Sequence, residues 1–247
     1  MTEALSGALL RHYLFDLLAV AMGVRYYASL RRNAGEGGLL ARGNFAVALG
    51  AIVGAGLGNK VVFWIDNPHL LPMLAEVPTG WLMGQSMVGG LVGGLIGVEV
   101  AKTIAGIKRS TGDGFVFPVL LALMIGRVGC FSAGLMDNTH GVETTLPWGY
   151  DYGDGVKRHP AQLYEIAFVG GLWIALARLR QYVASEPGLL FKLMLVAYLL
   201  WRLAIDFLKP VPFAYVGGLS GIQVVCLIAL ALYVPIAAGQ ARRLSHA

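Results

Sequence analysis

The stretch MVGGLVGGLIGVEV, Met87 to Val100, indicates the fold class, because it is almost continuously apolar and carries a glycine at every fourth position. One face of this segment consists of Gly89, Gly93 and Gly97, and a matching repeat upstream consists of Gly50, Gly54 and Gly58. Small residues at this spacing let two membrane helices approach closely. We interpret most of these glycines as packing residues. The alternative is a lipid headgroup reaching exposed backbone at the glycine-dense segment around Gly93 and Gly94.

The composition of the whole chain supports a membrane protein. Of its 247 residues 57% are hydrophobic and 13% are charged, whereas soluble domains carry about 25% charged residues. We therefore expect an all-α, polytopic protein in which residues 1–247 form a single transmembrane domain. The net charge of +5 does not require a nucleic-acid partner, because basic residues at the cytoplasmic ends of the spans account for it.

Seven segments are long and apolar enough to be candidate membrane spans, given that a crossing helix needs about 20 residues. They lie near residues 10–30, 44–65, 82–106, 115–135, 161–183, 188–208 and 217–238. The first segment is the least regular, since polar and charged side chains interrupt it. These are Arg11, His12, Asp16 and Arg25.

Basic residues concentrate in alternate connections between these segments. The basic positions are Arg31, Arg32, Arg42, Lys108, Arg109, Arg178, Arg180, Arg242 and Arg243. The intervening connections instead hold Asp66, Glu76, Asp137, Glu143, Asp151 and Asp154. The positive-inside rule then predicts an outside N-terminus, a cytoplasmic C-terminus and an outward-facing loop at 136–160.

Several ionisable side chains fall within the spans, where they are costly and mark either pairs or sites. Arg202 and Asp206 are four residues apart and can pair on one helix, as can Glu99 and Lys102 at a spacing of three. Arg127 has no acid at either spacing on its own helix. It needs a partner from another helix or an anion, and a guanidinium suits a phosphate well.

The stretch RHPAQLYE, Arg158 to Glu165, gathers polar groups at the start of the fifth span. Pro160 favours the first turn of a helix, and a helix N-terminus attracts anions. Gln162 and Glu165 share one helix face, with Tyr164 beside them. His159 is either a general base or a structural hydrogen-bonding group, and these residues alone leave both possibilities open.

Together these motifs resemble the bacterial prolipoprotein diacylglyceryl transferase family. RHPAQLYE resembles the family signature HPSQLYE, GRVGCFSAG (Gly126 to Gly134) resembles GRxGNFxNGE, and VGGLIGV (Val92 to Val98) resembles HGGLIGV. LLWRLAIDFLKP (Leu199 to Pro210) and SGIQ (Ser220 to Gln223) resemble its late arginine helix and its final helix. The motifs occur in the family's order and extend from the first to the last expected span.

The resemblance implies a multi-pass enzyme of the bacterial cytoplasmic membrane with phosphatidylglycerol as its lipid partner. Such an enzyme moves the diacylglyceryl group of this lipid onto the lipobox cysteine of a prolipoprotein, so that a thioether forms and glycerol phosphate leaves. No metal or organic cofactor is implied. This chemistry needs cations at the phosphate, a base for the thiol and a cavity for the lipid.

The resemblance, together with the polar residues near the outer loop and the glycines of the third span, assigns expected roles to individual positions. Arg127 matches the family's phosphate-side arginine and Arg202 its second functional arginine, and we expect catalytic proton carriers at His159, Asp137 and His140. The expected substrate-binding residues are Arg158, Gln162, Tyr164, Glu165, Gly93, Gly94 and, from a loose match to a WYG segment, Tyr13.

The chain also departs from the family pattern. Val92 stands where the family has a histidine before Gly-Gly, so this chain lacks that histidine as a base. Cys130, Ala133 and Leu135 replace the asparagines and the acid of GRxGNFxNGE. Either another residue is the base (Asp137, His140, His159 or Asp16), or the lipid passes to a different acceptor, or the protein binds phospholipid without catalysis. A transporter is less well supported, because the sequence has no internal repeat of the kind transporters use.

Overall fold

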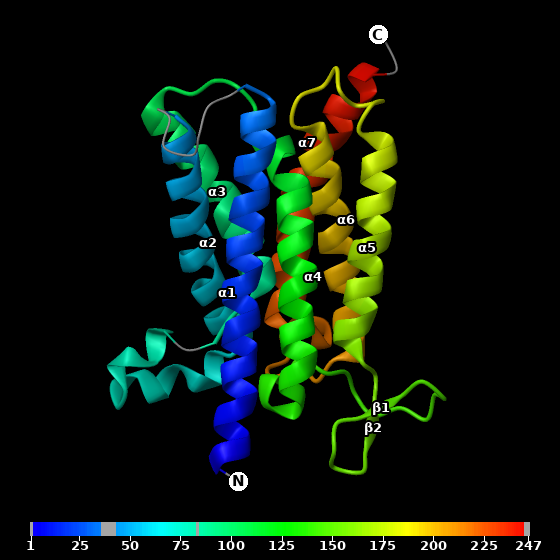
Figure 1. Ribbon diagram of the computed structural model, residues 1–247. Coiled ribbons are helices and arrows are strands. Elements are labelled where there is room, and N and C mark those ends of the chain that lie inside the picture. The colour runs from blue at the N-terminus through cyan, green and yellow to red at the C-terminus, as the bar shows by residue number, and fades with distance from the viewer. Residues whose placement is uncertain (1, 36–42, 83, 245–247) are drawn as a thin grey trace.

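The computed structural model describes residues 2–35, 43–82 and 84–244, and these form one bundle of roughly parallel helices (Figure 1). The α-helices are α1 (Thr2–Asn33), α2 (Asn44–Asp66), α3 (Met87–Ala105), α4 (Val116–Ala133), α5 (Ala161–Leu179), α6 (Leu189–Ile205) and α7 (Gly221–Leu244). Each of the seven expected segments therefore contains an α-helix, which confirms the predicted all-helical, polytopic fold.

Five of these regions are long and apolar enough to cross a membrane. They are α2, α3, the stretch Gly112–Asp137 that contains α4, α5 and α7. The helix α1 carries Asp16 and several basic residues, and α6 has 17 residues, fewer than the about 20 of a perpendicular crossing. Both run alongside the other helices (Figure 1), so crossings by α1 and α6 stay predictions.

The helices α2 and α3 pack through their glycine repeats. A Cβ on Gly54 would lie 2.3 Å from the carbonyl oxygen of Gly93, and one on Gly97 would lie 2.1 Å from that of Gly50. Such backbone contact excludes any side chain at these positions. The packing interpretation therefore holds for Gly93, which faces the backbone of α2.

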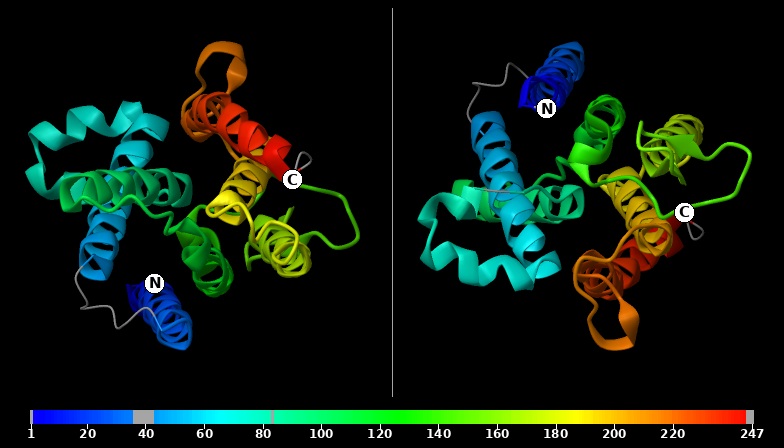
Figure 2. Two further views of the ribbon diagram at one scale, coloured as in Figure 1. Left: turned by 90° about the horizontal axis from the view of Figure 1, so that it is seen from above. Right: turned by 90° about the horizontal axis from the view of Figure 1, so that it is seen from below.

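A second close pair is formed by α1 and α4. A Cβ on Gly129 would lie 2.6 Å from the Cβ of Phe15, so the two helices approach closely near the middle of α1. Viewed along the bundle, α2 and α3 lie on one side of α4, and α5, α6 and α7 lie on the other (Figure 2). The hydrophobic core is centred on α6, where Met194, Leu195 and Leu199 are almost fully buried.

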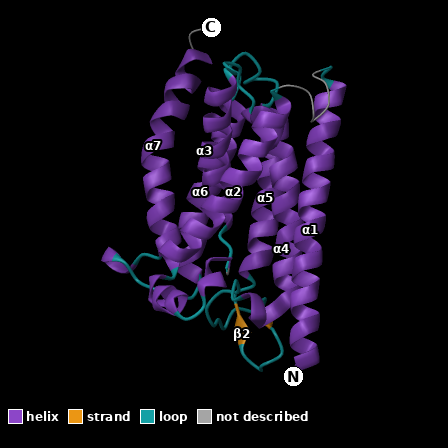
Figure 3. Ribbon diagram, turned by 90° about the vertical axis from the view of Figure 1, so that its left-hand side faces the viewer, coloured by secondary structure: helices purple, strands orange, loops and turns teal. Residues whose placement is uncertain are grey.

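The connections at the end of the bundle where α1 begins contain short elements. These are the 3-10 helices η1 (Pro68–Ala75), η2 (Pro78–Leu82), η4 (Gly134–Asp137), η5 (Asp206–Leu208) and η6 (Val216–Gly218), and the strands β1 (Tyr150–Asp151) and β2 (Lys157–Arg158). The strands pair antiparallel and stand out in the otherwise helical protein (Figure 3). The Val142 amide donates to the Leu208 carbonyl at 2.8 Å, which ties the 136–160 loop to the end of α6.

The basic ends of the helices lie at the opposite end of the bundle from this loop (Figure 1). There α3 leads through a loop to η3 (Gly112–Phe115) and α4. Most of the basic residues named above lie at this end among the described residues, whereas the 136–160 loop holds Lys157 and Arg158 beside its acids, and Arg42 lies outside the described residues. The orientation across the membrane itself stays a prediction.

Candidate functional site

A buried ionic cluster joins α4, α5 and α6 near the 136–160 loop. Arg127 Nε lies 3.0 Å from Glu165 Oε2, and Arg202 Nη1 lies 3.2 Å from the same oxygen. Glu165 is 0% exposed, and both arginines are buried. Arg127 thus finds its partner on another helix, as the sequence required, and one carboxylate bridges two guanidinium groups.

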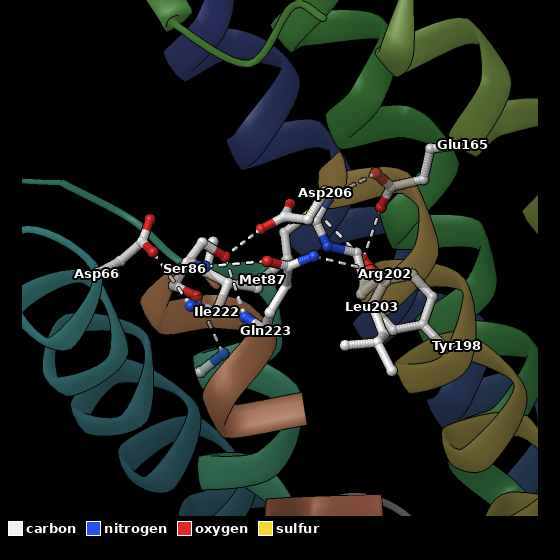
Figure 4. A network of polar contacts seen from close by, with 12 residues as sticks. Asp66, Ser86, Met87, Glu165, Tyr198, Arg202, Leu203, Asp206, Ile222 and Gln223 are labelled. Carbon is white, nitrogen blue, oxygen red and sulfur yellow. Dashed lines mark hydrogen bonds and ion pairs between the residues drawn. The ribbon is translucent and has the colours of Figure 1, made fainter. Parts of the chain in front are cut away.

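Further polar contacts extend this cluster to α7 (Figure 4). Arg202 Nη2 lies 2.8 Å from Asp206 Oδ1, so the predicted pairing along α6 is also present. The Ser220 hydroxyl donates to Asp206 Oδ2 at 2.6 Å, and the Tyr198 hydroxyl donates to Glu165 Oε1 at 2.6 Å. The two guanidinium and two carboxylate charges cancel, so the cluster is formally neutral.

Lys209 adds a third cationic side chain beside this cluster. It follows η5 directly and is half-buried. Burial, reinforced by the charges of Arg202 and Arg127, lowers the pKa of Lys209 to about 7. The Lys209 amine therefore changes charge near neutral pH, and an arriving anion would favour its protonated form.

An apolar cavity of about 520 Å³ lies between the α1–α4 pair and the α2–α3 pair. Asp16, Met87 and Gly126 line it next to the ionic cluster, and Glu99 and Lys192 line it toward the opposite end. The thirteen residues of α3 from Met87 to Glu99 span about 18 Å of helix. The cavity therefore has the elongated shape and apolar lining that suit an acyl chain.

Gly94 and Gly93 differ in relation to this cavity. Gly94 lines it, and a Cβ there would make only ordinary contact with Ala55 at 3.5 Å. Gly93 faces α2. Of these two predicted substrate-binding glycines, Gly94 is the one next to a cavity. Both arginines are neutralised by carboxylates and neither lines the cavity, but Gly126, which precedes Arg127, and Met87, whose sulfur lies 3.8 Å from the Tyr198 hydroxyl, do line it.

A second polar cluster lies where α1, α4 and η4 meet. His12 Nε2 lies 3.3 Å from Asp16 Oδ2, and His12 Nδ1 lies 3.3 Å from Asp137 Oδ1. The thiol of Cys130 is close to this imidazole and lies 3.7 Å from Arg127 Nη1. Asp16 and Asp137 were expected here as candidate bases, and Cys130 appeared only as a departure from the family signature.

His12 was missed as a functional candidate because two of its partners, Cys130 and Asp137, are remote in sequence. The available signal was its spacing of four residues from Asp16, which places both side chains on one face of α1. Tyr13, the neighbouring predicted binding residue, is 56% exposed. Its ring contacts the His12 ring edge-on, with the centroids 6.1 Å apart.

The residues of RHPAQLYE separate into two groups. Glu165 joins the ionic cluster, while Gln162 accepts from the Tyr152 hydroxyl at 2.8 Å and donates to the Thr139 hydroxyl at 3.2 Å. Thr139 in turn donates to Asp137, so Gln162 is connected to the second cluster. Burial raises the pKa of Tyr152 to about 12.

The remaining residues of this stretch stabilise the outer loop. Arg158 pairs with Asp154 at 2.8 Å, and His159 Nδ1 lies 3.2 Å from the hydroxyl of Tyr164. Trp148 Nε1 donates to the same hydroxyl at 2.9 Å. His140 contacts the carbonyl of its neighbour Gly141 at 2.9 Å. The structure therefore brings Asp16 and Asp137, rather than His140 and His159, next to His12 and Cys130.

These features define an integral membrane helix bundle in which a buried ionic cluster and a partly exposed polar cluster lie near an apolar cavity. The family profile described as prolipoprotein diacylglyceryl transferase matches residues 10–238. The chain therefore belongs to the prolipoprotein diacylglyceryl transferase family.

Curated relatives bear the name phosphatidylglycerol–prolipoprotein diacylglyceryl transferase. The protein from Nitratidesulfovibrio vulgaris strain DP4 is 32% identical over 197 residues, which cover 73% of this chain and 70% of the relative. That from Geobacter sulfurreducens is 29% identical over 226 residues, covering 84% and 81%. That from Bordetella bronchiseptica is 31% identical over 187 residues, covering 71% and 66%.

Proposed function

We propose that this protein transfers the diacylglyceryl group of phosphatidylglycerol to a thiol in the bacterial cytoplasmic membrane, with the cysteine of a prolipoprotein as the preferred acceptor. The observation that carries this proposal is the Arg127–Glu165–Arg202 cluster beside an apolar cavity of about 520 Å³. Family membership and the names of the relatives supply the donor lipid and the acceptor.

The charges of the cluster suit an anionic headgroup. The two arginines and two acids are balanced, so protonation of Lys209 gives this cluster one net positive charge. A phosphodiester carries one negative charge, and departure of glycerol phosphate increases the charge on its oxygens. Guanidinium groups held in place before the reaction stabilise that developing charge without reorganisation.

Glu165 acts as a positioning residue in this mechanism. One oxygen of its carboxylate holds both Arg127 and Arg202, and Tyr198 donates to the other oxygen. The acyl chains occupy the cavity, and Gly94 leaves room for them. The acceptor thiol then approaches from the side of the His12, Asp16 and Asp137 cluster, which lies next to Arg127 through Cys130.

The experiment uses the purified full chain in vesicles that contain phosphatidylglycerol labelled in its terminal glycerol, together with a lipobox peptide. Release of labelled glycerol phosphate and the mass of the peptide are measured. We expect both signals from the wild type, and Arg127→Lys lowers the rate at least about tenfold because it loses the planar fork. Arg178→Ala, an exposed change at the opposite end of α5, is the matched control and retains the rate.

A second candidate function is phospholipid binding without transfer. Val92 at the usual histidine position and the pairing of both arginines with carboxylates favour it. In that case the protein retains phosphatidylglycerol after purification, and no glycerol phosphate appears with the peptide or with any small thiol. Lack of release from a folded protein overturns the transferase proposal.

A further inference from the structure

The cluster at the junction of α1, α4 and η4 offers three different donor atoms to one point. An imidazole nitrogen of His12, the sulfur of Cys130 and a carboxylate oxygen of Asp137 all lie within 4.8 Å of one another. Nitrogen, sulfur and oxygen ligands of these types are those that Zn²⁺ takes in proteins. The family resemblance implies no metal, and the sequence alone does not show this convergence in space.

Asp16 contacts the second ring nitrogen of His12. It lies 3.3 Å from His12 Nε2, whereas Asp137 lies 3.3 Å from His12 Nδ1. A histidine that binds a metal through one ring nitrogen characteristically has a carboxylate or carbonyl at the other, which fixes the orientation of the ring. Asp16 therefore occupies the position of an orienting carboxylate, with His12 Nδ1 directed at the donor atoms.

The polar atoms of this cluster are incompletely satisfied. Among the described residues, His12 Nδ1 and Asp16 Oδ2 are buried and make no hydrogen bond of acceptable geometry, despite the 3.3 Å contacts. Two carboxylates surround one imidazole, and the adjacent Arg127 is engaged with Glu165. The cluster thus has an excess of negative charge and a buried donor atom directed into it.

We propose that His12, Cys130 and Asp137 bind a zinc-class divalent cation, and that its fourth coordination position takes the thiol of the acceptor. Three protein ligands and one open position are the arrangement of a catalytic zinc site. The location fits this role, since Cys130 lies beside Arg127 and Asp16 lines the lipid cavity. The part of the proposal that concerns the thiol rests on the proposed transferase function, whereas the metal site does not.

The chemistry balances without a further reactant. A thiol that coordinates the cation loses its proton to solvent, and its sulfur attacks the glyceryl carbon that carries the phosphate oxygen. The sulfur–carbon bond forms, the carbon–oxygen bond breaks, and the electron pair leaves with glycerol phosphate beside Arg127. Such a site would supply the thiol activation that the family's histidine, here Val92, cannot provide.

The competing occupant of the cluster is a proton, which would leave His12 as an imidazolium between two carboxylates. The two cases differ in their response to cobalt. The full chain is stripped with a chelator in detergent and titrated with Co²⁺, and the thiolate-to-cobalt absorption in the near ultraviolet is recorded. We expect this band in the wild type and in Cys226→Ser, a matched change at the other buried free cysteine. Cys130→Ser and His12→Gln lose the band.

Thermal unfolding separates loss of the site from loss of the fold. Zn²⁺ raises the Tm of the wild type and of Cys226→Ser, because a ligand that binds only the native state stabilises it. Cys130→Ser still melts cooperatively, and its Tm does not change with Zn²⁺. Absence of the cobalt band from the wild type, or the same band in the wild type and in Cys130→Ser, overturns the metal site.

The role of the metal is tested in the transfer assay. Metal binding with no glycerol phosphate release under any condition leaves the site standing and refutes the transferase function. Full transfer by chelator-treated, metal-free protein refutes the proposed thiol activation and leaves the transferase function standing. Transfer that is lost with the chelator and restored by Zn²⁺ supports both.

Discussion

Replacing Glu165 with glutamine removes the negative charge that bridges Arg127 and Arg202. The carboxylate is fully buried, with guanidinium nitrogens at 3.0 and 3.2 Å from one oxygen. Removing one partner of a buried ion pair costs roughly 3–5 kcal/mol, because the remaining charge stays buried and unpaired. Glutamine keeps an oxygen that can accept from Tyr198, which preserves a hydrogen bond of about 1 kcal/mol. We therefore expect Glu165→Gln to lower the free energy of unfolding by about 3–5 kcal/mol.

The assay is unfolding of the purified protein by added SDS in mixed micelles that contain no phospholipid. The matched control is Glu99→Gln, which removes the exposed partner of Lys102 at 3.0 Å and should cost less than about 1 kcal/mol. Added phosphatidylglycerol should stabilise Glu165→Gln more than the wild type, because its phosphate can replace the missing carboxylate. A loss within about 1 kcal/mol of the control would refute the reasoning, since the two arginines would then be stable without Glu165.

Three further predictions concern the packing, the cavity and the charge of the site. Gly97→Ala forces the α2–α3 backbones apart and should lower the free energy of unfolding by about 1–3 kcal/mol in the same assay. Its control is Gly56→Ala, which should not destabilise the protein, because a Cβ there meets nothing within 4 Å. Gly94→Leu fills the lipid cavity and should reduce binding of phosphatidylglycerol, measured by lipid mass spectrometry of the purified protein, without the backbone clash of Gly97→Ala. Binding of phosphatidylglycerol should weaken as the pH rises through about 7, because the Lys209 ammonium is lost above its lowered pKa; Lys209→Met should remove this step in a vesicle-binding titration.

Each of these predictions has a contrary result. Equal stability of Gly97→Ala and Gly56→Ala would mean that the two backbones are not in contact. Undiminished lipid in Gly94→Leu would place the acyl chains elsewhere. The same pH profile in the wild type and in Lys209→Met would show that Lys209 does not face the headgroup.

Local sequence patterns were sufficient to predict the helices and the α2–α3 interface. Continuous hydrophobicity located the seven helices, and the four-residue glycine spacing identified the two faces that meet. The pairing of Arg202 with Asp206 was accessible in the same way, since both lie on one helix. These features depend on residues within a few turns of one another, where spacing alone fixes the geometry.

Contacts between helices could not be predicted from spacing. The sequence showed that Arg127 needed a partner on another helix, but it could not single out Glu165, because side-chain convergence depends on how α4 and α5 rotate about their axes. For the same reason it could not place His12 against Cys130 or show that Gly93 faces α2 while Gly94 faces the cavity. The family resemblance identified the arginines, yet the second polar cluster contains Cys130, a position at which this chain departs from the family pattern.

The glycine contact between α2 and α3 also constrains how the protein can move. Where backbones touch directly, no side chains lie between them that could change rotamer and absorb a displacement. The two helices therefore move together as one rigid unit. Any widening of the cavity to admit or release a two-chain lipid must therefore move its other walls, which are α1 with α4 and the lining residues of α6 and α7. A tilt of α4 would shift Arg127 and Cys130 together.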